Sequence, residues 1–156
     1  MIASILSEDG DVHKSPGNYN TEYGLPLSLL EMDEKIDYGV FELGLQYPGD
    51  IEKLSEILSP TIGLITGVGM AHAEHFDSVS DIAQEKLKLT AGMAPGAKVL
   101  INAESDPLRK KARFKNQCEF IGYGNKKHQL VDYYATDISL KGIKGLEFKL
   151  NKVNSD

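Results

Sequence analysis

The sequence predicts an α/β fold, in which a mostly parallel sheet is flanked by helices and a small antiparallel hairpin lies at the C-terminal end. Two observations predict this class. Strand-like and helix-like segments alternate through the first 125 residues, which is the pattern of parallel strands joined by crossover helices. Tyr133–Leu140 and Leu146–Leu150 instead alternate residue by residue, with KGIKG as the turn between them. We therefore expect one parallel part over residues 1–125 and a hairpin over residues 130–152.

The first elements are short. Met1–Ser7 is predicted to be the tail of an amphipathic helix, because its Ile and Leu residues fall on one face. A very short strand is predicted over Val12–Lys14, and the segment PLSLLEM predicts a short helix. The loop between them, SPGNYNTEYG, is rich in turn formers, so on composition alone it is a surface loop.

The strands of the parallel part are predicted from apolar runs. Near-continuous apolar runs are typical of strands that are buried on both faces. Such runs occur at Ile36–Leu43, Thr61–Thr66, Ala97–Ile101 and, as a last short strand, Glu119–Gly122.

Helices are predicted between these strands. The apolar residues of Gly49–Leu58 recur at helical spacing, and Asp50 is expected to cap its first turn with its carboxylate. A second helix should start at Ser78 or Ser80 and run to about Met93, and a third should span Pro107–Phe114.

Composition and charge exclude several classes of protein. With 41% hydrophobic and 26% charged residues, 156 residues are enough for one domain with a single core. No apolar run approaches the ~20 residues that span a bilayer, so we expect no membrane insertion. The net charge of −6 argues against nucleic acid as the main partner, because nucleic-acid-binding domains usually carry a basic face. The start lacks signal-peptide features and there is one cysteine, Cys118, so we expect a cytoplasmic location.

Several polar residues follow predicted strands. In an open α/β sheet, ligands bind beyond the carboxyl ends of parallel strands, where the following loops share one edge. Six residues fall at such ends: Asn18, Asn20, Thr21, Glu42, His72 and Asn102. This convergence predicts a site at that edge of the sheet.

Glu42 stands in the apolar context VFELG. Burying a carboxylate there is costly unless it is paired or binds a metal, and Mg²⁺ takes one or two such ligands beside water. The alternative is a glutamate at a strand end that turns to solvent. His72 and His75 share one loop, but a zinc site is disfavoured because a third nitrogen or sulfur ligand is lacking nearby. Without other information, the two histidines are loop residues that form hydrogen bonds.

Lys86 and Asn102 also allow two interpretations each. Lys86 shares a helix face with Ile82, Leu89 and Met93. Its ammonium either extends to water, which spacing alone favours, or is buried and loses its proton more readily. Asn102 either caps the turn NAESDP or belongs to the site.

Five segments match, in order, the motifs of a known enzyme family. SPGNYNTEYGLPLSLL resembles GNxNNxxGxPLxLL, and VFELGLQYPGDI resembles VxELGxxxxGEI. GVGMAHAEHFDSVSDIAQEK resembles an AHxExFGS stretch that leads to a helix with AxxK, and KVLINAESD resembles an NADD-like turn. DYYATDISLKGIKGLEFKL resembles a small antiparallel sheet at the end of a domain. Together they resemble the middle, ATP-binding domain of the Mur ligase family, most closely the MurF type, and imply its P-loop NTPase-like fold.

The resemblance implies roles for the predicted site residues. Glu42 matches the glutamate that binds Mg²⁺ at the γ-phosphate of ATP, and His72 matches the histidine that helps to bind a second Mg²⁺. Lys86 matches the lysine that CO₂ carbamylates, which turns a buried cation into an anion able to support a metal. Asn102 matches the asparagine near the adenine.

The loop with Asn18, Asn20 and Thr21 matches the one that contacts the UDP-MurNAc-peptide substrate. In the implied reaction, ATP phosphorylates the terminal carboxylate of that substrate. The amine of D-Ala-D-Ala then attacks the acyl phosphate, and a tetrahedral intermediate collapses to an amide and phosphate. Metal ions neutralise charge on the transferring phosphoryl group.

The sequence departs from the family pattern in three places. Thr21 replaces a second asparagine, Lys88 replaces a glutamate two positions after the lysine, and Glu104 and Ser105 replace an acidic pair. A relative of the MurE, MurC, cyanophycin or folylpolyglutamate type therefore stays an alternative, although the GNYNTEYGLP loop favours the MurF type.

A phosphate-binding loop of the form GxxxxGKT is absent from the sequence, as are the strand that feeds it and the family's C-terminal domain. We expect that the chain alone does not turn over ATP, and that exposed apolar edges favour self-association. The alternative is a homologue without this loop that binds a nucleotide-sugar or a partner without chemistry. A dehydrogenase is disfavoured because no GxGxxG follows a strand.

Overall fold

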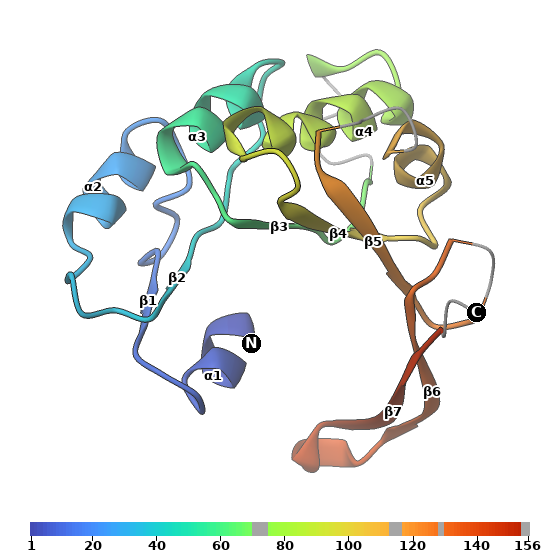
Figure 1. Ribbon diagram of the computed structural model, residues 1–156. Coiled ribbons are helices and arrows are strands. Elements are labelled where there is room, and N and C mark those ends of the chain that lie inside the picture. Colours follow the sequence, from blue (N-terminus) through green and yellow to red (C-terminus); the bar gives the residue numbers. More distant parts are fainter. Residues whose placement is uncertain (70–74, 113–116, 128–129, 154–156) are drawn as a thin grey trace.

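A computed structural model describes residues 1–69, 75–112, 117–127 and 130–153 (Figure 1). The elements, with 3₁₀ helices written η, are α1 (Ile2–Leu6), β1 (Val12–Lys14), α2 (Gly24–Leu30), β2 (Tyr38–Val40), α3 (Asp50–Leu58), β3 (Ile62–Ile65), α4 (Val79–Leu87), η2 (Lys88–Gly92), β4 (Lys98–Asn102), α5 (Asp106–Ala112), β5 (Glu119–Gly124), β6 (Tyr133–Leu140), η3 (Gly142–Lys144) and β7 (Leu146–Lys152). Within the described ranges, no helix has the length and apolar character that crossing a membrane requires.

The strands form two sheets. β1 and β2 pair in parallel, with Val12 opposite Tyr38. The second sheet has the order β3-β4-β5-β6-β7, in which pairing is parallel up to β6 and antiparallel between β6 and β7. β6 joins β5 through two register pairs at the end of β5, Tyr123 with Tyr133 and Gly124 with Tyr134. The predicted class, a mostly parallel sheet flanked by helices with a C-terminal hairpin, is confirmed.

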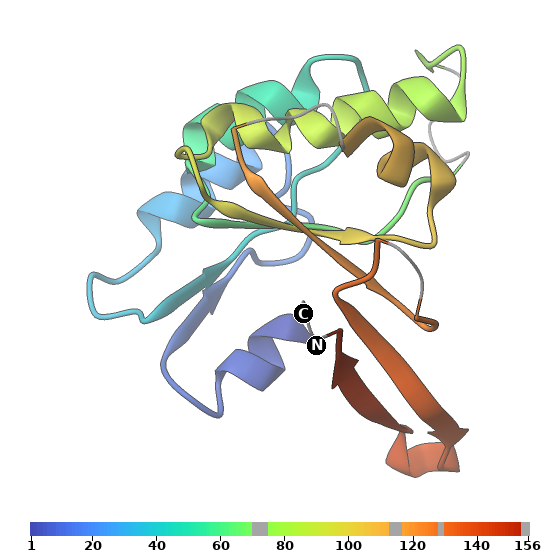
Figure 2. The same ribbon diagram turned by 45° about the vertical axis from the view of Figure 1, so that its right-hand side comes forward.

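The two faces of β3–β5 differ. Helices α3, α4 and α5 lie together on one side of these strands, and α1 lies on the other side (Figures 1 and 2). The covered side holds the main core, made of Ile51, Ile65, Ala83, Leu87, Leu89, Met93, Val99, Ile101, Leu108, Ala112 and Cys118. On the other side of β3, Ile62 is 65% and Leu64 is 38% exposed, because α1 contacts β1 and β2 instead. The burial expected for both faces of β3 therefore holds for one face.

The predicted elements are present, with shifted ends. The strand predicted over Ile36–Leu43 is shortened to β2, because the chain then leaves the sheet and approaches the loop after β1. The amide of Gly44 donates to the carbonyl of Asn20 at 2.7 Å, and a Cβ atom on Gly44 would lie 2.8 Å from that oxygen. Glycine is needed here for this close approach.

The helix predicted to reach Met93 consists of α4 followed by the 3₁₀ turn η2. Its start is Ser78, whose hydroxyl accepts a hydrogen bond from the amide of Asp81 at 3.2 Å. A serine at this position satisfies one of the unpaired amides of the first turn.

The prediction that Asp50 caps α3 is wrong. The residue at the N-cap is Gly49, with φ 99°. The Asp50 carboxylate accepts hydrogen bonds from the amides of Gln46 and Tyr47, at 3.0 and 2.7 Å, which precede the helix. The left-handed turn at Gly49 folds these amides back toward Asp50, so the carboxylate braces the loop rather than the first turn.

Candidate functional site

The ends of β3, β4 and β5 meet around the carbonyl of Thr66. Asn102, the last residue of β4, donates from Nδ2 to this oxygen at 3.1 Å. Its Oδ1 accepts from the amide of Glu104 at 3.0 Å, so Asn102 does cap the turn that follows. The two bonds fix the amide group of Asn102 at the carboxyl edge of the sheet.

Lys86 reaches the same edge from α4. Its ammonium donates to the carbonyl of Gly67, next to Thr66, at 2.8 Å. The side chain is half-buried, and loss of hydration lowers the pKa of Lys86. The ammonium therefore points toward the strand ends rather than away from them. The neutral amine, which is the nucleophilic form, is more populated than in a fully hydrated lysine at the same pH.

Tyr123 is a neighbour that sequence reasoning missed. It stands opposite Asn102 in the β4–β5 register, and its hydroxyl donates to the carbonyl of Thr66 at 3.4 Å. Burial raises the pKa of Tyr123, so its hydroxyl keeps its proton at neutral pH. The signal in the sequence was an aromatic residue, in IGYG, directly after the predicted strand Glu119–Gly122.

A second group of predicted residues lies beyond β1 and β2. The loop with Asn18, Asn20 and Thr21 connects β1 to α2. The amide of Asn20 donates to the carbonyl of Asn18 at 2.8 Å, which closes a tight turn. The Thr21 hydroxyl accepts from the amide of Gly24 at 3.3 Å, where α2 begins. Asn18 and Thr21 are exposed and Asn20 is half-buried, so all three can contact a ligand outside the loop.

Glu42 lies two residues beyond β2, and its side chain is exposed. Phe41 and Leu43 are partly buried while Glu42 is exposed, and its role as a metal ligand stays a prediction. The contact between Gly44 and Asn20 brings this segment beside the loop of Asn18–Thr21. The second group therefore combines a carboxylate with amide and hydroxyl groups.

The donor set fits magnesium better than zinc. In the described part of the chain, no group of three His, Cys, Asp or Glu side chains could hold a metal ion. An exposed carboxylate such as Glu42 is a usual single ligand for Mg²⁺, which keeps several waters and takes phosphate oxygens as further ligands. His72, the other predicted metal ligand, lies outside the described residues.

A ring contact connects the segment after Glu42 to the loop after β3. The rings of Tyr47 and His75 lie 4.4 Å apart between centroids, tilted by 42°. Tyr47 belongs to the loop between β2 and α3, and His75 follows the undescribed segment that contains His72. The segment that contains Glu42 therefore touches the loop after β3, whose residues Thr66 and Gly67 accept hydrogen bonds from Asn102 and Lys86.

Comparisons with known proteins agree with one another. The model of the Mur ligase middle domain family matches residues 1–156. The UDP-N-acetylmuramoyl-tripeptide–D-alanyl-D-alanine ligase of Synechocystis sp. is 39% identical over 124 residues, 80% of this chain and 27% of the relative. The ligase of that name from Bacillus subtilis is 34% identical over 153 residues, 94% of this chain and 32% of the relative.

A solved structure shares the fold as well. The MurF ligase from Thermotoga maritima in complex with ADP matches with a TM-score of 0.79 at 26% identity, over 96% of this chain and 36% of the other. The chain thus spans about a third of the length of the relatives that it matches.

Proposed function

The chain belongs to the Mur ligase middle domain family, and we propose that it acts as the ATP-using domain of a cytoplasmic ligase that joins D-Ala-D-Ala to UDP-MurNAc-tripeptide. One observation carries the proposal. Asn102 and Lys86, whose family counterparts act near the adenine and at a metal, bond to the carbonyls of the consecutive residues Thr66 and Gly67. The names of the Synechocystis and Bacillus relatives support the choice of substrates.

In the proposed reaction, a carboxylate oxygen of the UDP-MurNAc-peptide attacks the γ-phosphorus of ATP, and the bond to the ADP oxygen breaks. The D-Ala-D-Ala amine then attacks the carbonyl carbon of the acyl phosphate, and phosphate leaves. Mg²⁺, when bound, would neutralise charge on the phosphoryl group that is transferred. Glu42 is proposed to hold the ion at the γ-phosphate, His72 to help hold a second Mg²⁺, and carbamylated Lys86 to support the metal.

The other residues position the substrates. The amide of Asn102 is held by two hydrogen bonds, so it presents a fixed polar group to the adenine. Asn18, Asn20 and Thr21 would contact the sugar-peptide, since their loop is exposed and adjoins the segment of Glu42. Holding the carboxylate of the peptide and the nucleotide at one sheet edge reduces the entropy cost of the reaction.

Calorimetric titration of the chain with UDP-MurNAc-tripeptide and, separately, with Mg²⁺-ATP tests the proposal. We expect the sugar-peptide to bind and ATP to bind weakly, because the sequence has no GxxxxGKT loop to hold the phosphates. Failure of the sugar-peptide to bind would contradict the assignment of the Asn18–Thr21 loop.

A chimera separates the ligase from a homologue that binds without chemistry. This chain would replace the matching third of the Bacillus subtilis ligase, and phosphate release that depends on D-Ala-D-Ala would be measured. We expect activity, and a loss of about 100-fold or more on Glu42→Gln, because electrostatic stabilisation of the phosphoryl group is removed. Glu56→Gln, at an exposed position of α3, is the control. A folded chimera that binds both substrates without releasing phosphate would favour the non-catalytic alternative.

Carbamylation of Lys86 can be tested without activity. The neutral Nζ attacks the carbon of CO₂, an N–C bond forms, and one proton leaves to solvent. Because burial lowers the pKa of Lys86, its neutral fraction rises at lower pH than in hydrated lysines, so its carbamate should form at lower pH than those of hydrated lysines. ¹³C NMR with labelled bicarbonate would show this signal, and Lys86→Arg should remove it. A carbamate spectrum unchanged by Lys86→Arg would contradict the assignment.

A further inference from the structure

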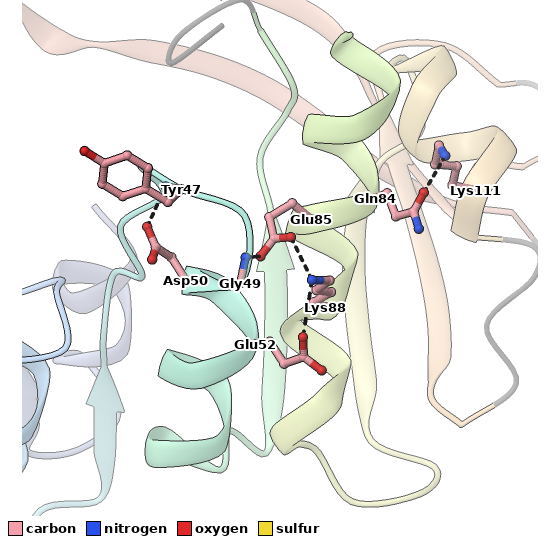
Figure 3. A network of polar contacts seen from close by, with 8 residues as sticks. All are labelled: Tyr47, Gly49, Asp50, Glu52, Gln84, Glu85, Lys88 and Lys111. Carbon is pink, nitrogen blue, oxygen red and sulfur yellow. Dashed lines mark hydrogen bonds and ion pairs between the residues drawn. The ribbon is translucent and has the colours of Figure 1, made fainter. Parts of the chain in front are cut away.

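Glu85, next to Lys86 on α4, has a buried carboxylate. Its side chain is 4% exposed, although carboxylates are rarely buried unless they are paired or hydrogen-bonded. Oε1 accepts a hydrogen bond from the amide of Gly49 at 2.7 Å, and Oε2 lies 3.0 Å from Nζ of Lys88 (Figure 3). Lys88 also lies 3.2 Å from the Glu52 carboxylate on α3. Glu85 thus contacts the residue before α3 directly, and Lys88 links it to Glu52 in the first turn of α3.

Gly49 connects the loop that follows Glu42 to the start of α3. It ends the loop Gly44–Gly49, which begins two residues after Glu42, and its φ of 99° turns the chain into α3. The other end of this loop is fixed by the bond from Gly44 to Asn20. Asp50 braces its middle through the amides of Gln46 and Tyr47. Because both ends and the middle of this loop are fixed by hydrogen bonds, the position of Gly49 constrains the segment that contains Glu42.

We propose that Glu85 is a positioning residue, which holds the loop Gly44–Gly49 against α4 and so keeps Glu42 in a fixed relation to Lys86. This inference rests on the proposed function, because it assumes that Glu42 and Lys86 serve one metal site. Glu85 would act through Gly49 and Lys88, and would not touch the substrates.

The energetics favour a positioning role over a purely stabilising one. Exposed ion pairs such as that between Lys88 and Glu52 contribute little, and a buried ion pair that is replaced as a whole by apolar side chains often causes no loss of stability. A bond from a backbone amide to a carboxylate is strong and directional, however, and an apolar side chain cannot reproduce it.

Residue-resolved hydrogen exchange measured by NMR tests the bond directly. In Glu85→Ala, exchange at the Gly49 amide should rise about tenfold or more relative to the amides of β4, because a hydrogen bond to a charged acceptor is lost. Glu85→Gln should restore part of the protection, since its amide oxygen can still accept. Gln84→Ala is the matched control, because Gln84 faces Lys111 on α5 (Figure 3) and should leave Gly49 unchanged. Equal changes at Gly49 and β4 in Glu85→Ala would overturn the inference.

Paramagnetic Mn²⁺ in place of Mg²⁺ tests the consequence. In the unsubstituted chain, Mn²⁺ should broaden the side-chain signals of Glu42 and Lys86 together. In Glu85→Ala the broadening should persist at Glu42 and be lost at Lys86, and Glu85→Gln should recover it. Unchanged broadening at Lys86 in Glu85→Ala would overturn the positioning role. If Mn²⁺ broadens neither signal in the unsubstituted chain, the proposed metal site fails, while exchange at Gly49 still decides whether Glu85 holds the loop.

Discussion

The helix-covered face of β3–β5 and the β6–β7 hairpin use the same kinds of apolar residue with opposite results. Leu87, the last residue of α4, is 1% exposed in the core on the covered face, whereas Leu140 in the hairpin is 85% exposed. Along β7, the apolar residues Leu146, Phe148 and Leu150 alternate with polar ones and are all more than half exposed. Alternation in a sequence therefore identifies a strand, but it does not guarantee that another element covers its apolar side.

The attachment of the two regions also differs. β4 pairs with β5 over five residues, from Lys98 with Glu119 to Asn102 with Tyr123. The hairpin is joined to β5 by two register pairs. Local opening free energies follow buried apolar contact, so we expect the hairpin to open without the covered face.

Truncating one leucine in each region tests this contrast and should give the largest effect. Leu87→Ala should lower the free energy of unfolding by about 2–5 kcal/mol, because it leaves a cavity in the core. Leu140→Ala should change it by less than about 0.5 kcal/mol, because the side chain is mostly in water. Urea unfolding followed by circular dichroism measures both. Similar losses would mean that the hairpin is covered in solution, as self-association through its apolar side would require.

A polar contact inside the covered face should have a smaller effect. Ser55 of α3 is fully buried, donates to the carbonyl of Leu89 and accepts from the amide of Gly92 at 3.2 Å. Ser55→Ala should cost about 1–3 kcal/mol, because two backbone groups of η2 lose a partner in a buried place. Ser80→Ala, at an exposed position of α4, is the control for hydroxyl removal. A negligible effect of Ser55→Ala would show that α3 and η2 pack through apolar contacts alone.

The fold was largely predictable because the covered face follows from apolar periodicity. The runs at β3 and β4 and the spacing in α3 placed each element within a few residues. The hairpin strands were also predicted closely, from alternation and the KGIKG turn. What periodicity could not show was the exposed side of β3, since Ile62 and Leu64 look like core residues in sequence.

The sequence selects candidate site residues one at a time, but it does not show the contacts that connect them. Strand ends identify Glu42 and Asn102, yet the contacts that relate them come from elsewhere. Glu85 looks like an ordinary charged residue on an amphipathic helix, and its bond to Gly49 spans 36 positions of sequence. Long-range hydrogen bonds of this kind depend on how α3 and α4 pack, which local patterns do not encode. Asp50 shows the same limit, because the N-cap of α3 is Gly49, whose left-handed conformation was not predicted from the sequence.

Substitutions at two residues with positive φ, one in each region, should have the smallest effects on stability and test the contrast between the covered face and the hairpin further. Ser59, at the end of α3, has φ 48°, and Asp137, at the irregular part of β6, has φ 55°. Glycine adopts this conformation more readily, so Ser59→Gly should stabilise the chain by up to about 1 kcal/mol, net of the entropy that glycine loses on folding. Asp137→Gly should give less, because aspartate tolerates the left-handed region better than most residues.

The part of the chain that each substitution stabilises is more informative than the size of the stabilisation. If the hairpin opens independently, Asp137→Gly should slow hydrogen exchange in β6 and β7 and leave the unfolding midpoint unchanged, whereas Ser59→Gly should raise that midpoint. Ser59→Ala, which removes the hydroxyl and its bond to the Glu56 carbonyl but keeps a Cβ atom, separates backbone strain from the lost hydrogen bond. A rise in the midpoint for Asp137→Gly equal to that for Ser59→Gly would mean that hairpin and core unfold as one unit. Two register pairs would then be enough to couple them, and the exposed apolar residues of the hairpin would be part of the cooperative structure.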